Sequence, residues 1–377
     1  MGRTNNLINP FPLMDYVSPE YFCDREIETE KIISALKNGR NVTLVSVRRL
    51  GKTALLKHVL KKVSKNKSTR ILYLDILPTE NLAGFIKTFS DAILKDEKSN
   101  GRFLTKVSKL LSGIKGKLVF DDVTGVPSVE VTVDDEKSGE LSIQIIFEYL
   151  AEQKEKYIIV IDEFQQITNY PEKNVEAILR TQIQHQHKDS FVFSGSSKHT
   201  LISMFSDYGK PFYQSSDLLE LGRIDKKVYS KFIKKQFKKR NKEIDTAYID
   251  QQIDNFCNHT FYVQYFFNRL FEKAGSVITQ ADINLVTEEI VKEREYVFYN
   301  YRNLLSSLHF NILIAIAKEG GVSQINAGWF LTQYKLGQPS SVSSAVKILS
   351  DKEMIYHENG KYQIYDVFFE KWLSKVF

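Results

Sequence analysis

The chain has 377 residues but only two cysteines, Cys23 and Cys257. Two such distant cysteines provide neither a metal-binding spacing nor a disulfide framework. No apolar run in the sequence approaches the length needed to cross a membrane. Residues 1–10 are polar and lack the apolar core of a signal peptide. We therefore expect a protein of the reducing cytoplasm that has no membrane partner.

Outside one segment, the chain has almost no excess of positive over negative charge. The net charge is +6, yet residues 225–240 alone hold eight basic residues and one acid. Val228, Phe232, Ile233 and Phe237 fall at helical spacing there, which predicts an amphipathic helix with a lysine-rich face. Such a face is either simply solvated or follows the phosphates of a nucleic acid. The composition, 42% hydrophobic and 26% charged, is ordinary for a globular protein.

A phosphate-binding loop is the first chemical motif. Residues 46–53, Ser-Val-Arg-Arg-Leu-Gly-Lys-Thr, match the G-x-x-x-x-G-K-[ST] pattern except that Ser46 replaces the first glycine. An apolar strand is predicted before the loop and a helix after it, which points a helix N-terminus at a phosphate. In such loops Lys52 neutralises phosphate oxygens and the Thr53 hydroxyl binds Mg²⁺. The candidate nucleotide-binding residues here are Ser46, Val47, Arg48, Arg49, Leu50, Gly51, Lys52, Thr53 and Ala54.

A second motif, at residues 157–163, is an apolar strand that ends in two acids, Asp162 and Glu163. We expect Asp162 to assist Thr53 at the metal, and Glu163 to orient an attacking water with Lys52 at the phosphates. Both motifs together are typical of an ATP- or GTP-binding core. The base-reading motif of GTPases, Asn-Lys-x-Asp, does not occur at a suitable place.

Strands alternate with helices up to about residue 225, which predicts a parallel sheet covered on both faces. Ligands of such sheets bind beyond the carboxyl ends of the strands, so the loop, the two acids and Ser196 and Ser197 would converge there. Ser196 or Ser197 is the candidate γ-phosphate sensor. The polar segment of about residues 95–140 predicts an inserted β-hairpin.

The remaining chain divides in two. Residues 226–302 are predicted to be helical without strands. Residues 303–377 predict three helices followed by two short strands across Asn359-Gly360, which is the order of a winged helix. The expected domains are therefore 1–225, 226–302 and 303–377.

These motifs resemble the archaeal-type P-loop ATPases, a prokaryotic family within the AAA+ and signal-transduction ATPase assemblage. The resemblance rests on the double-arginine loop at 48–53, the stretch 193–198, the N-terminal boxes at 9–11 and 22–26, and the ending at 365–373. It implies an α/β fold with a parallel-sheet P-loop NTPase core, a helical lid and a C-terminal winged-helix domain. It also implies ATP, not GTP, as the nucleotide, with Mg²⁺.

The resemblance adds further site residues. Phe22 and Arg25 fall in the box that lies beside the nucleotide base in this family. His259 belongs to a lid motif that often has the form Gly-His-Pro-Tyr-Tyr-x-Gln in the family. Residues 258–264 keep its His259 and Gln264 but lack its glycine and proline.

The expected function is a slow Mg²⁺-dependent ATPase that acts as a nucleotide-driven conformational switch. Two alternatives stay open. One is a DNA-binding ATPase that uses the winged helix and the 226–240 helix. The other is a nucleotide-stabilised scaffold for a protein partner or a homo-oligomer. The candidate recognition helix at 340–350 carries one basic residue, Lys347, which weakens the DNA alternative.

Overall fold

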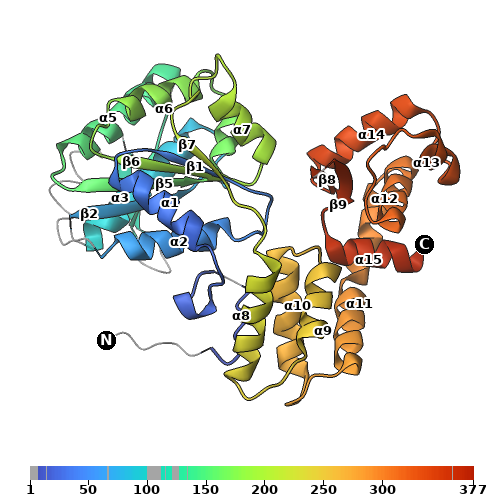
Figure 1. The fold of residues 1–377 in the computed structure, drawn as a ribbon. Coiled ribbons are helices and arrows are strands. Elements are labelled where there is room, and N and C mark those ends of the chain that lie inside the picture. Colours follow the sequence, from blue (N-terminus) through green and yellow to red (C-terminus); the bar gives the residue numbers. More distant parts are fainter. Residues whose placement is uncertain are drawn as a thin grey trace. The chain divides into compact units, whose positions relative to one another are not determined.

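The computed structural model describes residues 7–13, 15–65, 68–99, 112–114, 116–120, 127–133, 135–358 and 360–377 (Figure 1). Its contacts divide the chain into two compact units. One is Met14–Asp225, and the other combines Met1–Leu13 with Lys226–Phe377. We describe each unit by itself.

The first unit contains a five-stranded sheet in which every neighbouring pair is parallel. In spatial order its strands are β2 (Thr69–Asp75), β5 (Lys156–Asp162), β6 (Ser190–Gly195), β1 (Val42–Val45) and β7 (Asp217–Glu220). Among its described residues, this unit contains the helices α1 (Glu26–Lys37), α2 (Lys52–Val63), α3 (Leu82–Ser99), α5 (Glu136–Glu152), α6 (Val175–Gln184) and α7 (Lys198–Ser206), and the 3₁₀ helices Pro19–Tyr21 and Phe164–Asn169.

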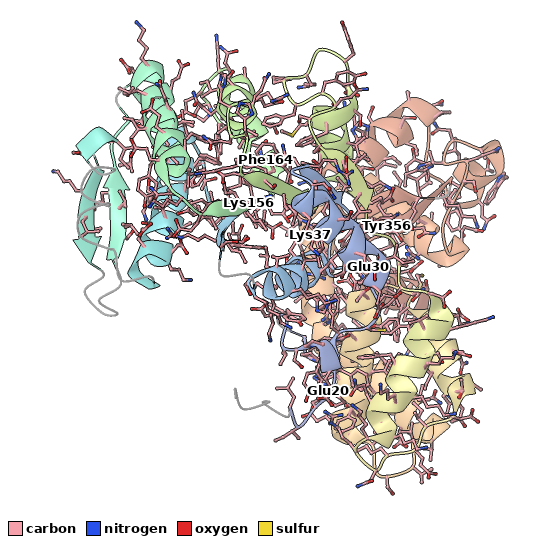
Figure 2. The ribbon with its side chains drawn as sticks, turned by 60° about the vertical axis from the view of Figure 1, so that its left-hand side comes forward. Glu20, Glu30, Lys37, Lys156, Phe164 and Tyr356 are labelled. Atoms are coloured by element: carbon pink, nitrogen blue, oxygen red, sulfur yellow. The ribbon has the colours of Figure 1, made fainter. Side chains whose placement is uncertain are left out.

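The central strands β5, β6 and β1 are buried on both faces of this sheet. In β5, Ile158 and Val160 pack in a cluster with residues of α1 and α2, whereas Ile159 and Ile161 pack with residues of α3, α5 and α6. A strand covered on both sides needs a continuous apolar sequence, which is why β5 was recognisable. Lys156 and Phe164, labelled in Figure 2, mark where β5 begins and where the chain continues beyond its carboxyl end.

A separate antiparallel pair, β3 (Gly116–Phe120) and β4 (Pro127–Val131), is the predicted hairpin. Its turn, at 121–126, lies outside the described residues. Asp91 of α3 holds the pair, because its carboxylate accepts a hydrogen bond from the Val129 amide at 2.7 Å. Helix α3 reaches Ser99 and α5 begins at Glu136, so both helices extend into the segment expected to be an insertion.

Strand β7 was not predicted. Three of its four residues are exposed, and Leu218 has 45% of its surface accessible. Its short sequence therefore lacks the apolar run that marks the other strands. Pairing with β1 alone defines it, and that pairing places β1 between β6 and β7.

The second unit begins with four helices, α8 (Lys226–Lys238), α9 (Thr246–Asn255), α10 (Thr260–Lys273) and α11 (Gln280–Leu304). Residues 7–13 pack onto them. The Phe11 ring is 1% exposed and contacts the rings of Phe237, Phe267 and Phe271. Asn268 donates a hydrogen bond to the Phe11 carbonyl at 2.7 Å, which fixes the backbone of this segment.

The same unit ends in a winged helix, so the predicted fold class is confirmed. It contains α12 (Ser307–Glu319), α13 (Gly328–Gln333), α14 (Pro339–Asp351), β8 (Ile355–Glu358), β9 (Lys361–Ile364) and α15 (Val367–Val376). Strands β8 and β9 form the antiparallel wing. Asn359 of the predicted turn lies outside the described residues. Trp372 of α15 is 1% exposed, and its ring packs against Phe298 of α11. Within the described residues, no helix is both long and apolar enough to cross a membrane.

Candidate nucleotide-binding site

The predicted phosphate loop connects β1 to α2, and its conformation explains its glycine. Gly51 has a φ of 98° and precedes the first residue of α2, Lys52. This left-handed backbone favours glycine. Ser46, in contrast, is not among the described residues with positive φ. Its buried hydroxyl donates to the Val47 carbonyl at 2.8 Å. A serine is therefore compatible with the start of this loop.

The loop helix and the acidic strand meet at Asp162. The Thr53 hydroxyl lies 3.3 Å from one Asp162 carboxylate oxygen, and the Tyr73 hydroxyl donates to the same oxygen at 2.5 Å. Ser194 donates to the other oxygen. Asp162 is 6% exposed, so these donors hold a buried carboxylate at the carboxyl end of β5. Carboxylate and hydroxyl oxygens are the ligands that Mg²⁺ prefers, so Thr53 and Asp162 fit the predicted metal site.

Glu163 follows directly, with a φ of 57°. Its Oε2 accepts hydrogen bonds from the Ser196 amide at 3.1 Å and the Ser196 hydroxyl at 2.8 Å. Gln165 donates to the same oxygen at 2.6 Å. Burial raises the pKa of Glu163, but the hydrogen bond from Gln165, the charge of Lys52 and the Ser196 donors outweigh it and lower the pKa. The carboxylate is therefore kept ionised in this site.

One arginine of the loop, Arg48, reaches the residue that follows β6. Arg48 Nε donates to the Ser196 hydroxyl oxygen at 3.2 Å. Since Ser196 also contacts Glu163, one side chain connects the phosphate loop to the acidic strand. Arg49 is exposed and has a φ of 63°. The structure thus brings Arg48, Glu163 and Ser196 together, as the parallel topology predicts for the carboxyl ends of β1, β5 and β6.

Arg25 fixes the N-terminal box against the loop. Its guanidinium donates to the Gly222 carbonyl at 2.8 Å and lies 3.5 Å from the Leu50 carbonyl. It also pairs with Glu28 at 3.0 Å. Arg25 is 4% exposed, so its hydrogen bonds replace water at a buried guanidinium. In this structure Arg25 connects protein segments around the loop.

Phe22 lies beside the loop helix. Its ring stacks on the His58 ring of α2, with centroids 4.6 Å apart and planes at 19°. The Tyr16 hydroxyl makes a hydrogen bond of 2.9 Å with His58 Nδ1. This contact places His58 beside the N-terminal box at 22–26, and the spacing of residues along α2 alone does not indicate it.

Two predicted residues take other positions. Ser197 makes its hydroxyl contact with Thr200 at 2.9 Å, at the start of α7, so Ser196 is the serine next to Glu163. His259 is in the second unit, where it is 4% exposed and its ring lies 4.8 Å from that of Tyr262. Its role at a nucleotide therefore stays a prediction, as do the roles of the other residues.

Three side chains of the site were missed in the sequence, namely Tyr73, Ser194 and Gln165. Tyr73 lies between buried Leu72 and Leu74 on β2, and Ser194 follows a buried apolar run on β6. Both strands are neighbours of the strand that bears Asp162. A polar residue near the carboxyl end of a predicted parallel strand was the available signal. Gln165 lies only two residues after Glu163, and nothing in the sequence distinguished it from Gln166.

The fold and this constellation define a P-loop nucleotide-binding protein. Residues 22–252 match the family model described as an ATPase domain predominantly from Archaea, and the chain belongs to that family. Residues 296–375 match a model described as a probable winged helix domain. No curated protein matches the sequence.

Solved structures share the fold across nearly the full chain. A Walker-type ATPase of Pyrococcus abyssi has a TM-score of 0.66 at 18% identity, covering 97% of this chain and 99% of its own. The Aeropyrum pernix ORC2 protein, in ADPNP–ADP complexes, has a TM-score of 0.60 at 14% identity, with coverage of 97% and 96%. The Aeropyrum pernix ORC1 protein, in complex with DNA, has 0.56 at 14%, with coverage of 98% and 97%. At such identities the likeness concerns the fold alone.

Proposed function

We propose that this protein is a Mg²⁺-dependent ATPase in which ATP acts as a conformational switch. The observation that supports it best is the meeting of Thr53 and Asp162 at 3.3 Å, from two motifs far apart in the sequence. These two residues would hold Mg²⁺, with Lys52 on the phosphates. A bound Mg²⁺ would neutralise phosphate charge during transfer.

In this proposal Glu163 orients the attacking water. Its carboxylate is ionised and adjoins Ser196, which Arg48 also contacts. We propose that Ser196 and Arg48, together with Lys52, donate hydrogen bonds to the terminal phosphate. An ionised carboxylate with a lowered pKa is a weak base at neutral pH, so we expect slow turnover.

The first test separates binding from hydrolysis. We expect Lys52→Ala to lose nucleotide affinity, measured with a fluorescent ATP analogue and Mg²⁺. Glu163→Gln should keep that affinity and lose turnover by roughly 10²-fold or more, the range expected for a positioned general base. Lys57→Ala, which changes an α2 lysine that pairs with Asp15, is the matched control and should change neither property. Hydrolysis that survives in Glu163→Gln would contradict the assignment.

The switch requires ATP to prefer one arrangement of the two units, because a ligand shifts an equilibrium only by its differential affinity. The chain passes between the units twice, near residue 14 and at residue 225. Both tryptophans of the protein, Trp329 and Trp372, are in the second unit. An ATP-dependent change of their emission in Glu163→Gln would support the switch. Identical emission and hydrogen exchange of residues 226–377 with and without ATP would contradict it.

DNA binding is the second candidate function, and the exposed face of α8 favours it. Five lysines of α8 are exposed and, at 100° per residue, fall within an arc of about 100°. Helix α8 contains no acid. The exposed face of α14 is instead mostly serine, with Lys347 as its one basic residue. The five α8 lysines are Lys227, Lys231, Lys234, Lys235 and Lys238.

Salt dependence tests this candidate. If α8 follows phosphates, duplex DNA should bind at low salt, and replacing Lys231, Lys235 and Lys238 by glutamate should abolish binding. Each phosphate contact contributes about 0.9 to the slope of log affinity against log salt. Replacing Lys347 by glutamate is the control and should leave binding nearly unchanged. If no DNA binds at low salt, the scaffold for a protein partner or a second copy is favoured instead.

A further inference from the structure

Gln165 occupies a space that only glycine leaves open. It lies in the 3₁₀ helix Phe164–Asn169, and its amide carbonyl oxygen approaches the backbone of Gly195 at the end of β6. A Cβ atom at position 195 would lie 1.9 Å from that oxygen, far inside van der Waals contact. The backbone φ of Gly195 does not lie in the left-handed region that favours glycine. An alanine at position 195 would therefore displace the amide end of the Gln165 side chain.

The carbonyl end of Gln165 is buried and has no hydrogen-bond partner among the described residues. Its amide nitrogen donates to Glu163 at 2.6 Å. Burying a polar atom without a partner costs free energy, so this orientation is held by the contact with Glu163. This orientation of the Gln165 side chain indicates that its function is to hydrogen-bond Glu163 and not only to fill space.

All three donors to the Glu163 side chain reach the same oxygen, Oε2. Within the described part of the chain, Oε1 accepts no hydrogen bond from the protein. The Ser196 hydroxyl has a single proton, which it gives to Glu163 here while its oxygen accepts from Arg48. If the Ser196 hydroxyl instead donates its hydrogen bond to a phosphate, Gln165 and the Ser196 amide remain as the donors that orient the Glu163 carboxylate.

We infer that Gln165 is a positioning residue for Glu163: it anchors Oε2 so that Oε1 is the oxygen presented to the attacking water. This rests on the ATPase function proposed above. Gly195 contributes to this positioning, because the absence of a side chain at position 195 leaves the space in which the Gln165 amide lies. A carboxylate that is fixed through one oxygen presents its other oxygen to the reacting groups in a defined orientation.

A positioning role predicts that loss of the Gln165 contact lowers kcat and leaves the Kd of ATP nearly unchanged, because Glu163 is proposed to act on the attacking water alone. A purely structural role would weaken ATP binding together with turnover. Comparing kcat with the Kd of ATP therefore separates the two roles.

The test compares Gln165→Leu with Gly195→Ala, which keeps Gln165 but removes its space. We expect both to lower kcat about tenfold or more, as a displaced catalytic group does, with the Kd of ATP within twofold of the wild type. Gln166→Leu is the control, since the Gln166 side chain donates to the Thr79 carbonyl at 2.8 Å and not to the Glu163 carboxylate. The substitution keeps the backbone hydrogen bond from Gln166 to the Glu163 carbonyl. It should leave kcat unchanged.

A second measurement does not need activity. Carboxyl-carbon NMR of the nucleotide-free protein at one pH, with Glu163→Gln to assign the resonance, reports the hydrogen bonding of Glu163 through its chemical shift. An unchanged chemical shift in Gln165→Leu would show that the contact does not exist. A changed chemical shift with unchanged or increased kcat would also overturn the positioning role. If the wild type binds ATP but does not hydrolyse it, the proposed ATPase function fails, while the NMR result still decides whether Gln165 orients Glu163.

Discussion

The Thr53 hydroxyl lies 3.3 Å from the Asp162 carboxylate, although the two residues are 109 positions apart. Each was predicted to act at the metal from its own motif, Thr53 as a ligand and Asp162 as its partner in the outer sphere. Their meeting follows from the topology, because β5 and β1 are neighbours of the same strand, β6, in a parallel sheet. The site is thus assembled from two local motifs by one sheet.

Asp162→Asn should weaken Mg²⁺-dependent ATP binding about tenfold or more, since it removes the charge from a hard oxygen ligand. The asparagine would also oppose the donors Tyr73 and Ser194 with its own amide protons. The measurement is ATP affinity against Mg²⁺ concentration. Asp75→Asn is the matched control, because Asp75 pairs with Asp162 in register but is exposed. Equal Mg²⁺ dependence in both variants would argue against a metal at Asp162.

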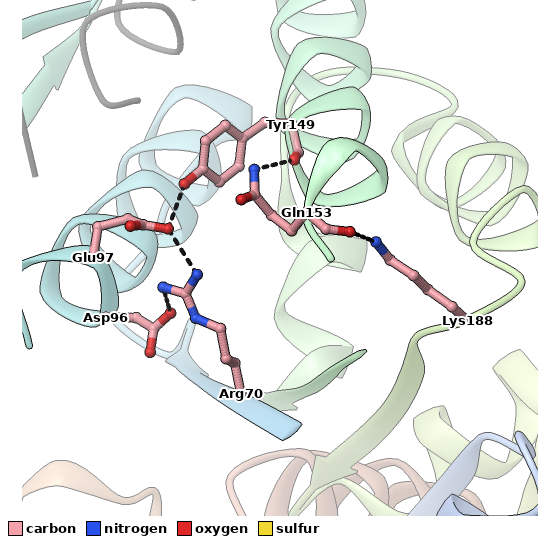
Figure 3. A network of polar contacts seen from close by, with 6 residues as sticks. All are labelled: Arg70, Asp96, Glu97, Tyr149, Gln153 and Lys188. Atoms are coloured by element: carbon pink, nitrogen blue, oxygen red, sulfur yellow. Dashed lines mark hydrogen bonds and ion pairs between the residues drawn. The ribbon is translucent and has the colours of Figure 1, made fainter. Parts of the chain in front are cut away.

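A buried charge network at the opposite end of the sheet should be important for stability. Figure 3 shows Arg70 of β2 paired with Asp96 and, at 2.8 Å, with Glu97. Tyr149 donates to the same Glu97 oxygen at 2.7 Å. Glu97 is fully buried and Arg70 is 8% exposed. Removing one partner leaves an uncompensated buried charge.

Arg70→Met should therefore reduce the free energy of unfolding of the first unit by about 3–5 kcal/mol. Hydrogen exchange at the β2 and β5 amides measures it, because those strands report on this unit alone. The control is Arg40→Met, whose pairing with Asp217 is about half exposed and contributes about 0–1 kcal/mol. Similar reductions of the free energy of unfolding in the two variants would show that burial does not increase the contribution of the Arg70 network to stability.

The N-terminal segment should stabilise the unit formed with residues 226–377. Phe11→Ala removes a buried ring from among Phe237, Phe267 and Phe271, and such truncations cost about 3–5 kcal/mol. Urea unfolding followed by tryptophan emission reports on this unit, because both tryptophans belong to it. Ile8→Ala, at a side chain 92% exposed, should have little effect. If Phe11→Ala unfolds like Ile8→Ala, the segment does not pack there in solution.

Glu370 predicts a pH dependence of stability. Burial raises the pKa of Glu370 to about 7, while the charge of Lys371 opposes the shift. The folded state then holds a proton that the unfolded chain releases near pH 4.5, so stability falls as pH rises from about 4.5 to 7. Below that window both states are protonated and the penalty is absent.

Glu370→Gln should flatten this dependence, because the amide does not ionise. The thermal midpoint of tryptophan emission at pH 5 and pH 8 measures the difference. The wild type should lose more stability between these values than the variant does. Glu319→Gln, at an exposed position of α12, should behave like the wild type. A wild-type slope retained in Glu370→Gln would place the titrating group elsewhere.

Much of the fold could be predicted because its signals are local. The buried strands β1, β2, β5 and β6 are marked by apolar sequence, and the winged-helix order follows from helices and a turn near the end of the chain. The family match confirms the expected class of protein. Strand β7 could not be predicted, since an exposed edge strand is defined by its pairing and not by its own residues.

By itself, the sequence determined the phosphate loop, the acidic strand and the residue types that suit phosphate and Mg²⁺. Only the tertiary structure decided that Ser196 and not Ser197 contacts Glu163, and that Gln165 lies over Gly195. It also decided that Phe11 packs with helices more than 200 residues away. The physical reason is that backbone preference and apolar periodicity act over a few neighbouring residues. A hydrogen bond or a close approach, in contrast, depends on where distant segments pack.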